Sequence, residues 1–272
     1  MLPSMMSLLE SSSWVFSSLV AMFVGITVCM FILWLVRKHF SVKELQKSHD
    51  VVGFTFSIVG VLYSVILGFT VISAQTRYSA VQETIHSEAI ILAELYQDAA
   101  FFPQVEQTAI RTALRNYVNH VITEEWESTA NRKPNPKTRI YLREIWNSYT
   151  NIILKDEKTN VWYTESISKL NSFTNARLAR QFNAFEHLGS MMWSLLVIGA
   201  FITVGFMFLF GLENWRSHML MTAILAGYLS FMLYLVYSLD NVFTGAQRIQ
   251  PSALIEVQTF FDQLDKDPLQ NR

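Results

Sequence analysis

Four long stretches of the chain contain no acidic or basic residue and no histidine. They cover residues 14–36, 51–73, 191–212 and 219–239, and they hold 23, 23, 22 and 21 residues. Because an α-helix rises about 1.5 Å per residue, each stretch is long enough to cross a hydrocarbon core of about 30 Å. The pattern therefore predicts four membrane-spanning helices. The first is longer than the roughly 7–15 apolar residues of a signal peptide, so we interpret it as an uncleaved anchor.

Between the second and third stretches, apolar residues follow a heptad pattern that is typical of a helix. The repeating positions are Val71, Tyr78, Ile85, Leu92 and Ala99, with Ala74, Val81, Leu95 and Phe102 between them and Glu88 as the polar exception. No Gly or Pro interrupts residues 69–102. The pattern predicts one helix that leaves the bilayer and ends near Phe102 and Pro103.

Three more helices are predicted before the third stretch, at residues 104–128, at 136–154 and from 161 onward. Asn135 is placed to cap the second of these, with Pro136 at its first position. The last carries apolar residues at Ile167, Leu170, Phe173, Leu178, Phe182 and Phe185.

These elements predict an all-α fold with four transmembrane helices and a helical soluble domain inserted between the second and third. The segments are an N-terminal tail (1–13), two spans (14–73), the extramembrane domain (74–190), two spans (191–239) and a C-terminal tail (240–272).

The two short loops that connect spans, 37–50 and 213–218, together hold five Lys and Arg residues. Their basic residues are Arg37, Lys38, Lys43, Lys47 and Arg216. Short loops rich in Lys and Arg stay in the cytoplasm. This predicts a multi-pass protein of the cell (inner) membrane with both termini and the helical domain on the non-cytoplasmic side.

Composition agrees with a lipid bilayer as the main partner. The chain is 51% hydrophobic and only 16% charged, against roughly 25% charged residues in soluble domains. A net charge of -1 gives no basic excess for binding nucleic acid. Nucleophile-elbow, phosphate-loop and zinc-protease motifs are absent from the sequence. We therefore predict that the protein is not an enzyme and has no catalytic residue, metal ligand or cofactor.

Small residues form one stripe of the second span. Gly53, Ser57, Gly60, Ser64 and Gly68 are four, three, four and four positions apart, which puts them on one side of a helix. Such a stripe lets another helix approach closely. Alternatively, it lines a narrow polar path around an oligomer axis, because Gly and Ser offer room and hydroxyls without a buried charge. The two interpretations can coexist.

Several short motifs, in a specific order, resemble the bestrophin-like family. They are YSVILGF with Tyr63, Leu67 and Phe69, RYSAV with Arg77 and Tyr78, SEA with Glu88, LY at 95–96, NYVNHVITEEW with Glu125 and Trp126, the pair Arg177 and Arg180, and LDNVFTGAQRIQPSAL with Asp240, Phe243 and Gly245. The resemblance covers about residues 50–255. Val242 stands where the family usually has a proline.

The resemblance implies kinship with bestrophins, which are pentameric anion channels with four spanning helices per subunit and a helical domain between the second and third. It therefore implies a homo-oligomer and a small inorganic ion as the conducted species. Bestrophins keep their termini and helical domain in the cytoplasm, opposite to the orientation that the loop charges predict, and we keep the latter.

Two functions remain open from the sequence. The first is an oligomeric, passive ion channel with the second span near the axis and the heptad helix joining subunits. The second is a non-conducting membrane scaffold that binds a partner through its helical domain, with Glu88 in the heptad seam fixing partner choice.

Overall fold

The computed structural model describes residues 5–46, 49–131, 133–153, 156–245 and 247–266. Every regular element in these ranges is helical, as the sequence predicts. The chain divides into two compact units. Unit 1 comprises Met1–Tyr78 and His187–Arg248, and unit 2 comprises Ser79–Glu186 and Ile249–Arg272.

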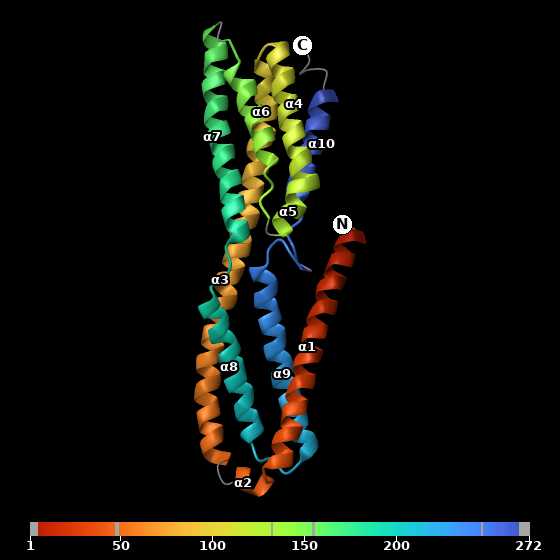
Figure 1. Ribbon diagram of the computed structural model, residues 1–272, viewed down its shortest axis with the longest axis vertical. Helices are drawn as coiled ribbons and strands as arrows, with labels where there is room; N and C mark the ends of the chain where they lie inside the picture. Colours follow the sequence, from red (N-terminus) through yellow and green to blue (C-terminus); the bar gives the residue numbers. More distant parts are fainter. Residues whose placement is uncertain (1–4, 47–48, 132, 154–155, 246, 267–272) are drawn as a thin grey trace. The chain divides into compact units, whose positions relative to one another are not determined.

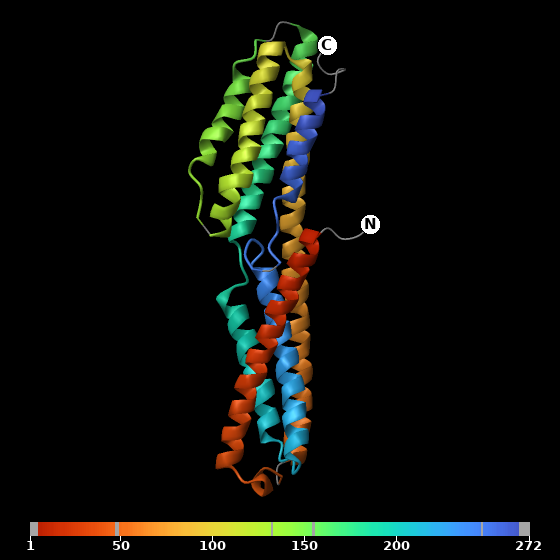
Figure 2. The ribbon, with the colours of Figure 1, turned by 90° about the vertical axis from the view of Figure 1, so that its right-hand side faces the viewer.

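The predicted apolar helices pack together in unit 1 (Figures 1 and 2). They are α1 (Met5–His39), the first half of α3 (His49–Asp98), α8 (Ser190–Leu209) and α9 (Trp215–Asp240), and the short α2 (Val42–Gln46) joins α1 to α3. Four helices of the described chain are long and apolar enough to cross a membrane, in agreement with the sequence prediction.

Glycines outside the predicted stripe let these helices approach one another. A Cβ atom added to Gly25 of α1 would collide with the side chain of Ser230 on α9. One added to Gly199 of α8 would collide with the ring of Tyr63 on α3, whose hydroxyl donates to the Leu196 carbonyl at 3.0 Å. Small residues at such contacts bring helix backbones together where no hydrophobic effect drives them.

The two basic loops meet at one end of unit 1. Arg37 Nη2 donates to the Leu212 carbonyl and lies 2.8 Å from His218 Nδ1. Gln46 donates to Glu213 at 3.3 Å. Arg37 and the 213–218 loop therefore lie on one side of the helices, as the predicted orientation requires, while Lys47 lies outside the described residues.

Unit 2 is a helical bundle built on the second half of α3 (Figures 1 and 2). The other helices are α4 (Gln104–His120), α5 (Trp126–Ala130), α6 (Thr138–Thr150), α7 (Glu157–Phe185) and α10 (Ser252–Lys266). A 3-10 turn, η1 (Ala99–Phe101), ends α3, and a π-helical turn, η2 (Val121–Glu125), separates α4 from α5. The end of α3 matches the predicted end of the heptad helix.

The other predicted helix limits need correction. The predicted helix 104–128 begins where predicted and ends two residues later, at Ala130, with η2 as a π-helical turn within it. The Asp156 carboxylate accepts from the Thr159 amide at 2.7 Å, so α7 begins four residues before the predicted residue 161. Asn135 accepts from the Lys137 amide at 3.0 Å, but in a turn that precedes α6, so this helix begins at Thr138 and not at residue 136.

The heptad seam is buried inside the chain, which overturns its predicted role in joining subunits. Ala74, Val81, Leu92 and Leu95 are each at most 3% exposed. Glu88 has no exposed surface and bonds within the same chain. It is therefore not available to choose a partner, and the observation that favoured a scaffold is lost.

The predicted apolar face of α7 divides in two. Leu170 and Phe173 are fully buried in unit 2. Leu178, Phe182 and Phe185, from the same predicted pattern, point outward and are exposed.

Candidate functional site

The small-residue stripe of α3 is not a helix contact within the described chain. Ser57 and Ser64 are exposed, and a Cβ atom added to Gly60 or Gly68 would meet no atom within 4 Å. At Gly53 the nearest atom is a ring carbon of Phe210 at 3.8 Å. The stripe is thus open along most of its length to whatever lies beside the chain.

The two stripe hydroxyls are already bonded to their own helix. Ser57 donates to the Gly53 carbonyl at 2.9 Å and Ser64 to the Val61 carbonyl at 2.8 Å. Each hydroxyl keeps acceptor lone pairs, so the surface presents dipoles and no formal charge. Of the motif residues on this span, Tyr63 and Leu67 are buried on another side of α3, and Phe69 is 70% exposed.

A second group of motif residues meets at Asp240, the last residue of α9. Its carboxylate accepts from Arg77 Nη1 at 3.0 Å, from the Leu188 amide at 2.7 Å and from Trp193 Nε1 at 3.1 Å. The Asp240 side chain is 5% exposed, so these bonds replace the water that a carboxylate needs. This Asp240 junction ties the end of α9 to α3 and to the start of α8.

The closing motif turns the chain just after the junction. Gly245 has φ of 81°, a conformation that side chains with a Cβ rarely adopt. Phe243 is buried, and Tyr78 on α3 donates its hydroxyl to the Gln247 carbonyl at 3.1 Å. The motif residues Tyr78, Phe243 and Gly245 therefore shape this turn.

The remaining motif residues gather in unit 2 around Arg180. Its guanidinium donates to Glu88 from Nε at 2.5 Å and from Nη2 at 3.2 Å, and Nη2 also donates to Glu125 at 2.9 Å. Arg177 Nη2 donates to the other oxygen of Glu125 at 3.2 Å, and the Tyr117 hydroxyl donates to Glu88 at 2.6 Å. We call these five residues the Arg180 cluster.

The charges of the Arg180 cluster balance, two acidic against two basic. Burial would raise the pKa of Glu125, but the neighbouring charges of Arg180 and Arg177 outweigh it and lower that pKa. Burial, reinforced by the Glu88 charge, raises the pKa of Tyr117 well above its usual value, so this phenol stays protonated and donates. A balanced, hydrogen-bonded buried network has a fixed geometry and no spare charge for binding a substrate.

The π-helical turn η2 ends at Glu125. A π turn adds a residue to the helical repeat and is common at functional positions. The next residue, Trp126, donates its indole N–H to the Ile249 carbonyl at 3.1 Å. Sequence periodicity of 3.6 does not reveal such a turn.

Sequence reasoning missed the contacts of α10. Phe261 stacks on Tyr96 with ring centroids 3.8 Å apart, and Asp262 and Asp265 accept from Arg115 at 2.6 and 2.8 Å. The sequence does contain a signal for these contacts. Two acidic residues lie three positions apart on an amphipathic segment, and Arg111 and Arg115 lie four positions apart, so each pair shares one side of a helix.

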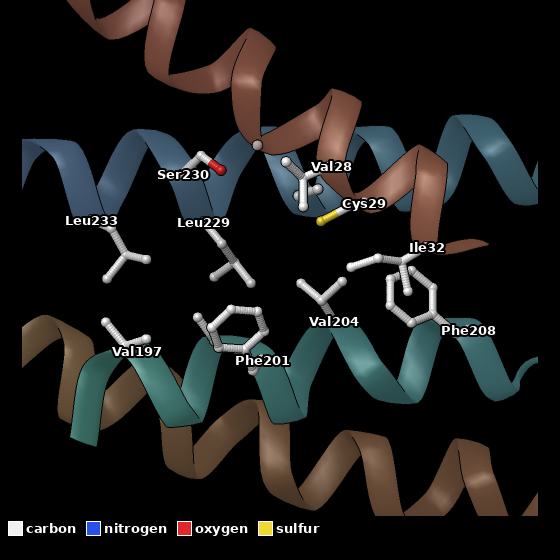
Figure 3. Close-up of a pocket in the computed structure, with 13 residues that line it drawn as sticks. Val28, Cys29, Ile32, Val197, Phe201, Val204, Phe208, Leu229, Ser230 and Leu233 are labelled. Carbon is white, nitrogen blue, oxygen red and sulfur yellow. The ribbon is translucent and has the colours of Figure 1, made fainter. Parts of the chain in front are cut away.

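An apolar cavity of about 220 Å³ lies between α1, α8 and α9 (Figure 3). The side chains around it include Cys29 and Ile32 of α1, Phe201 and Val204 of α8, and Leu229 of α9. Only Ser230 and Cys29 offer a polar side-chain atom. In the described residues no group of three His, Cys, Asp or Glu side chains is placed to hold a metal ion.

Comparison with known proteins identifies one family. The model of the Bestrophin-like domain matches residues 23–254. No curated protein matches the chain.

Solved structures with a similar fold include those of a bacterial bestrophin homologue from Klebsiella pneumoniae. Two single-substitution variants have TM-scores of 0.68 at 12% identity, over 92% and 90% of this chain and 99% and 98% of theirs. The structure from Zn-SAD phasing gives 0.65 at 12% identity, over 92% of this chain and 99% of that one. At this identity the likeness establishes the fold.

Proposed function

Because the chain belongs to the bestrophin-like family, we propose that it is an oligomeric membrane channel that conducts small inorganic ions passively, with anions as the first class to test. The observation that carries this proposal is the open stripe of α3. It presents Ser57, Gly60 and Ser64 on a side that no helix of the described chain covers.

The chemistry of the stripe suits passive permeation. Hydroxyls and backbone dipoles can replace part of the water around an ion, and the absence of fixed charge lets the ion leave again. Acidic, basic and histidine residues are absent from 51–73, so this stretch offers no site for a coupled proton. The same stripe can also seat a neighbouring subunit along part of its length.

The rest of the chain supports a membrane-anchored assembly. We propose that unit 1 spans the bilayer four times and that unit 2 lies in water, since residues 74–188 carry 13 basic and 13 acidic residues. From the basic loops we propose that unit 2 and both termini are on the non-cytoplasmic side of the inner membrane.

Planar-bilayer recordings of the purified chain test the proposal. We expect discrete currents that Gly60→Leu reduces at least tenfold, because a leucine there projects into the path from a position where a Cβ atom meets no neighbouring element within 4 Å. Ser64→Ala should change ion selectivity with little loss of current. Val65→Leu is the matched control, since Val65 is exposed away from the stripe, and it should behave as the parent chain. Folded protein that conducts in none of several lipids would contradict the proposal.

A further inference from the structure

The last four turns of α7 present no charge to their surroundings. Their charged residues are Arg177 and Arg180, and both are buried. The outward side instead carries three apolar side chains from the predicted apolar pattern of this helix. They are Leu178, Phe182 and Phe185, which are 41, 72 and 38% exposed, and we call them the α7 knobs.

Contacts within unit 2 show which residues of α3 lie beside the α7 knobs, and this position along the axis of α3 is called their level. Arg180 pairs with Glu88, and Asn183 donates to Thr84 at 3.4 Å. The two helices are antiparallel, so Phe182 lies close to the level of Thr84.

Lipid tails do not reach this level. Thr84 is eleven residues past Ser73, the last residue of the apolar stretch, and α3 is continuous between them. Eleven residues rise about 16 Å. The headgroup region adds only about 5–8 Å beyond the hydrocarbon core. A protein surface is then the cover that would remove the α7 knobs from water.

Unit 2 also carries a groove that is lined mainly by small, uncharged side chains. It lies between α3 and α7 and has a volume of about 550 Å³. Small side chains line it, namely Ala80, Thr84 and Ser87 from α3 and Ser172, Ala176 and Ala179 from α7. Glu83 is the one charged residue among its lining residues. We call it the α3–α7 groove.

We infer that the α7 knobs of one copy of this chain pack into the α3–α7 groove of the next copy. The contact is heterologous, and such a contact closes a ring when the rotation from one copy to the next divides a full turn. The inference rests on the proposed function for its assumption of a homo-oligomer, and it adds the surfaces that join the subunits outside the bilayer.

Two geometric requirements of a closed ring are met. A pure rotation keeps every atom at its height, so the two halves of the contact must share a level, and Thr84 lines the groove at the level of Phe182. Each copy must also present its knobs to one neighbour and its groove to the other, so the two surfaces must face different directions. At about 100° per residue, the knobs and the groove-lining residues of α7 lie roughly 100° apart around its axis.

Disulfide trapping tests the contact. In a full-length Cys29→Ala background, which removes the single cysteine, Phe182→Cys is combined with Ser87→Cys and the purified oligomer is oxidised with copper phenanthroline in air. We expect a ladder that extends past the dimer on non-reducing gels and collapses with reductant. Each single variant should stay monomeric on the same gels, and a mixture of the two single variants should stop at the dimer.

A charge substitution tests the same contact without a cross-link. Phe182→Asp should raise the dissociation constant of the oligomer at least tenfold by native mass spectrometry. Ile140→Asp is the matched control, because Ile140 is 58% exposed on α6 and should leave it unchanged.

The outcomes separate the inference from the function on which it rests. An intact oligomer with no ladder and no response to Phe182→Asp overturns this contact, points to another protein as the cover of the knobs, and leaves the proposed channel standing. A dimer from Phe182→Cys alone overturns it in favour of a symmetric pairing of knobs. A chain that is monomeric in every detergent and nanodisc overturns both.

Discussion

Arg180 is the largest side chain without exposed surface among the described residues. Removing a guanidinium from water is costly unless carboxylates and hydrogen bonds replace its hydration. Glu88 and Glu125 provide that replacement at Nε and Nη2, and the indole ring of Trp126 lies 5.7 Å from the guanidinium carbon. The motif residues of unit 2 therefore act together, and loss of one leaves the others buried without a partner.

Glu88→Gln should consequently destabilise the fold by about 3–5 kcal/mol, the usual cost of removing one partner from a buried ion pair. Glu94→Gln on the same helix is the matched control. Its side chain is 47% exposed beside Lys169, and an exposed pair contributes about 0–1 kcal/mol. Chemical unfolding in a mild detergent measures both, and equal losses would contradict the role of the Arg180 cluster.

Glu125 should make stability depend on acid. Its pKa in the folded chain is lowered, from an unfolded value of about 4.3, so the ionised carboxylate stabilises the fold above that pH. The contribution is lost as the pH falls through the lowered pKa. Melting temperatures between pH 7 and 3 should fall less steeply for Glu125→Gln than for the parent chain. Glu124→Gln, at a side chain that is 46% exposed, should keep the parent slope.

At the scale of elements, α10 illustrates how a segment outside the apolar stretches joins the fold. Its apolar side, with Leu254, Val257 and Phe261 buried, packs in unit 2, while Asp262 and Asp265 pair with arginine at the surface. Surface ion pairs contribute little, so the buried face provides most of the docking energy.

Phe261→Ala should therefore release α10. Truncating a buried phenylalanine costs about 3–5 kcal/mol, and α10 has few other buried side chains to hold it. Hydrogen exchange of the α10 amides should accelerate strongly, while Ile255→Ala, at a residue 47% exposed, should leave them protected. Unchanged exchange in Phe261→Ala would mean that the ion pairs hold the helix.

At the scale of the whole molecule, cysteine labelling tests the predicted orientation in the membrane. The basic loops favour a cytoplasmic position for residues 37–50, whereas bestrophins place their termini and helical domain in the cytoplasm. In the Cys29→Ala background, Ser41→Cys should resist an impermeant maleimide in intact cells and react after lysis. Ser252→Cys should react in intact cells. The reverse pattern would show that unit 2 is cytoplasmic.

The family motifs show what a sequence reveals before a structure is known. Their order along the chain was sufficient to identify the family, but not to reveal which of them meet at Asp240 and which meet around Arg180. Arg77 and Asp240 are 163 positions apart, and Glu88 and Arg180 are 92 apart. Such contacts depend on how helices pack, which no local pattern encodes.

The sequence by itself determined the helical class, the four membrane-length helices and the end of the heptad helix. Uncharged length and apolar period are local properties of a chain, and bilayer thickness and the helical repeat turn them directly into structure. Only the tertiary structure decided which apolar residues are buried. It buried the heptad seam within the chain, left the α3 stripe and the α7 knobs exposed, and brought α10 into unit 2. These outcomes depend on the neighbours of each helix face, and a helix with more than one apolar or small-residue face does not specify which face its neighbours will cover.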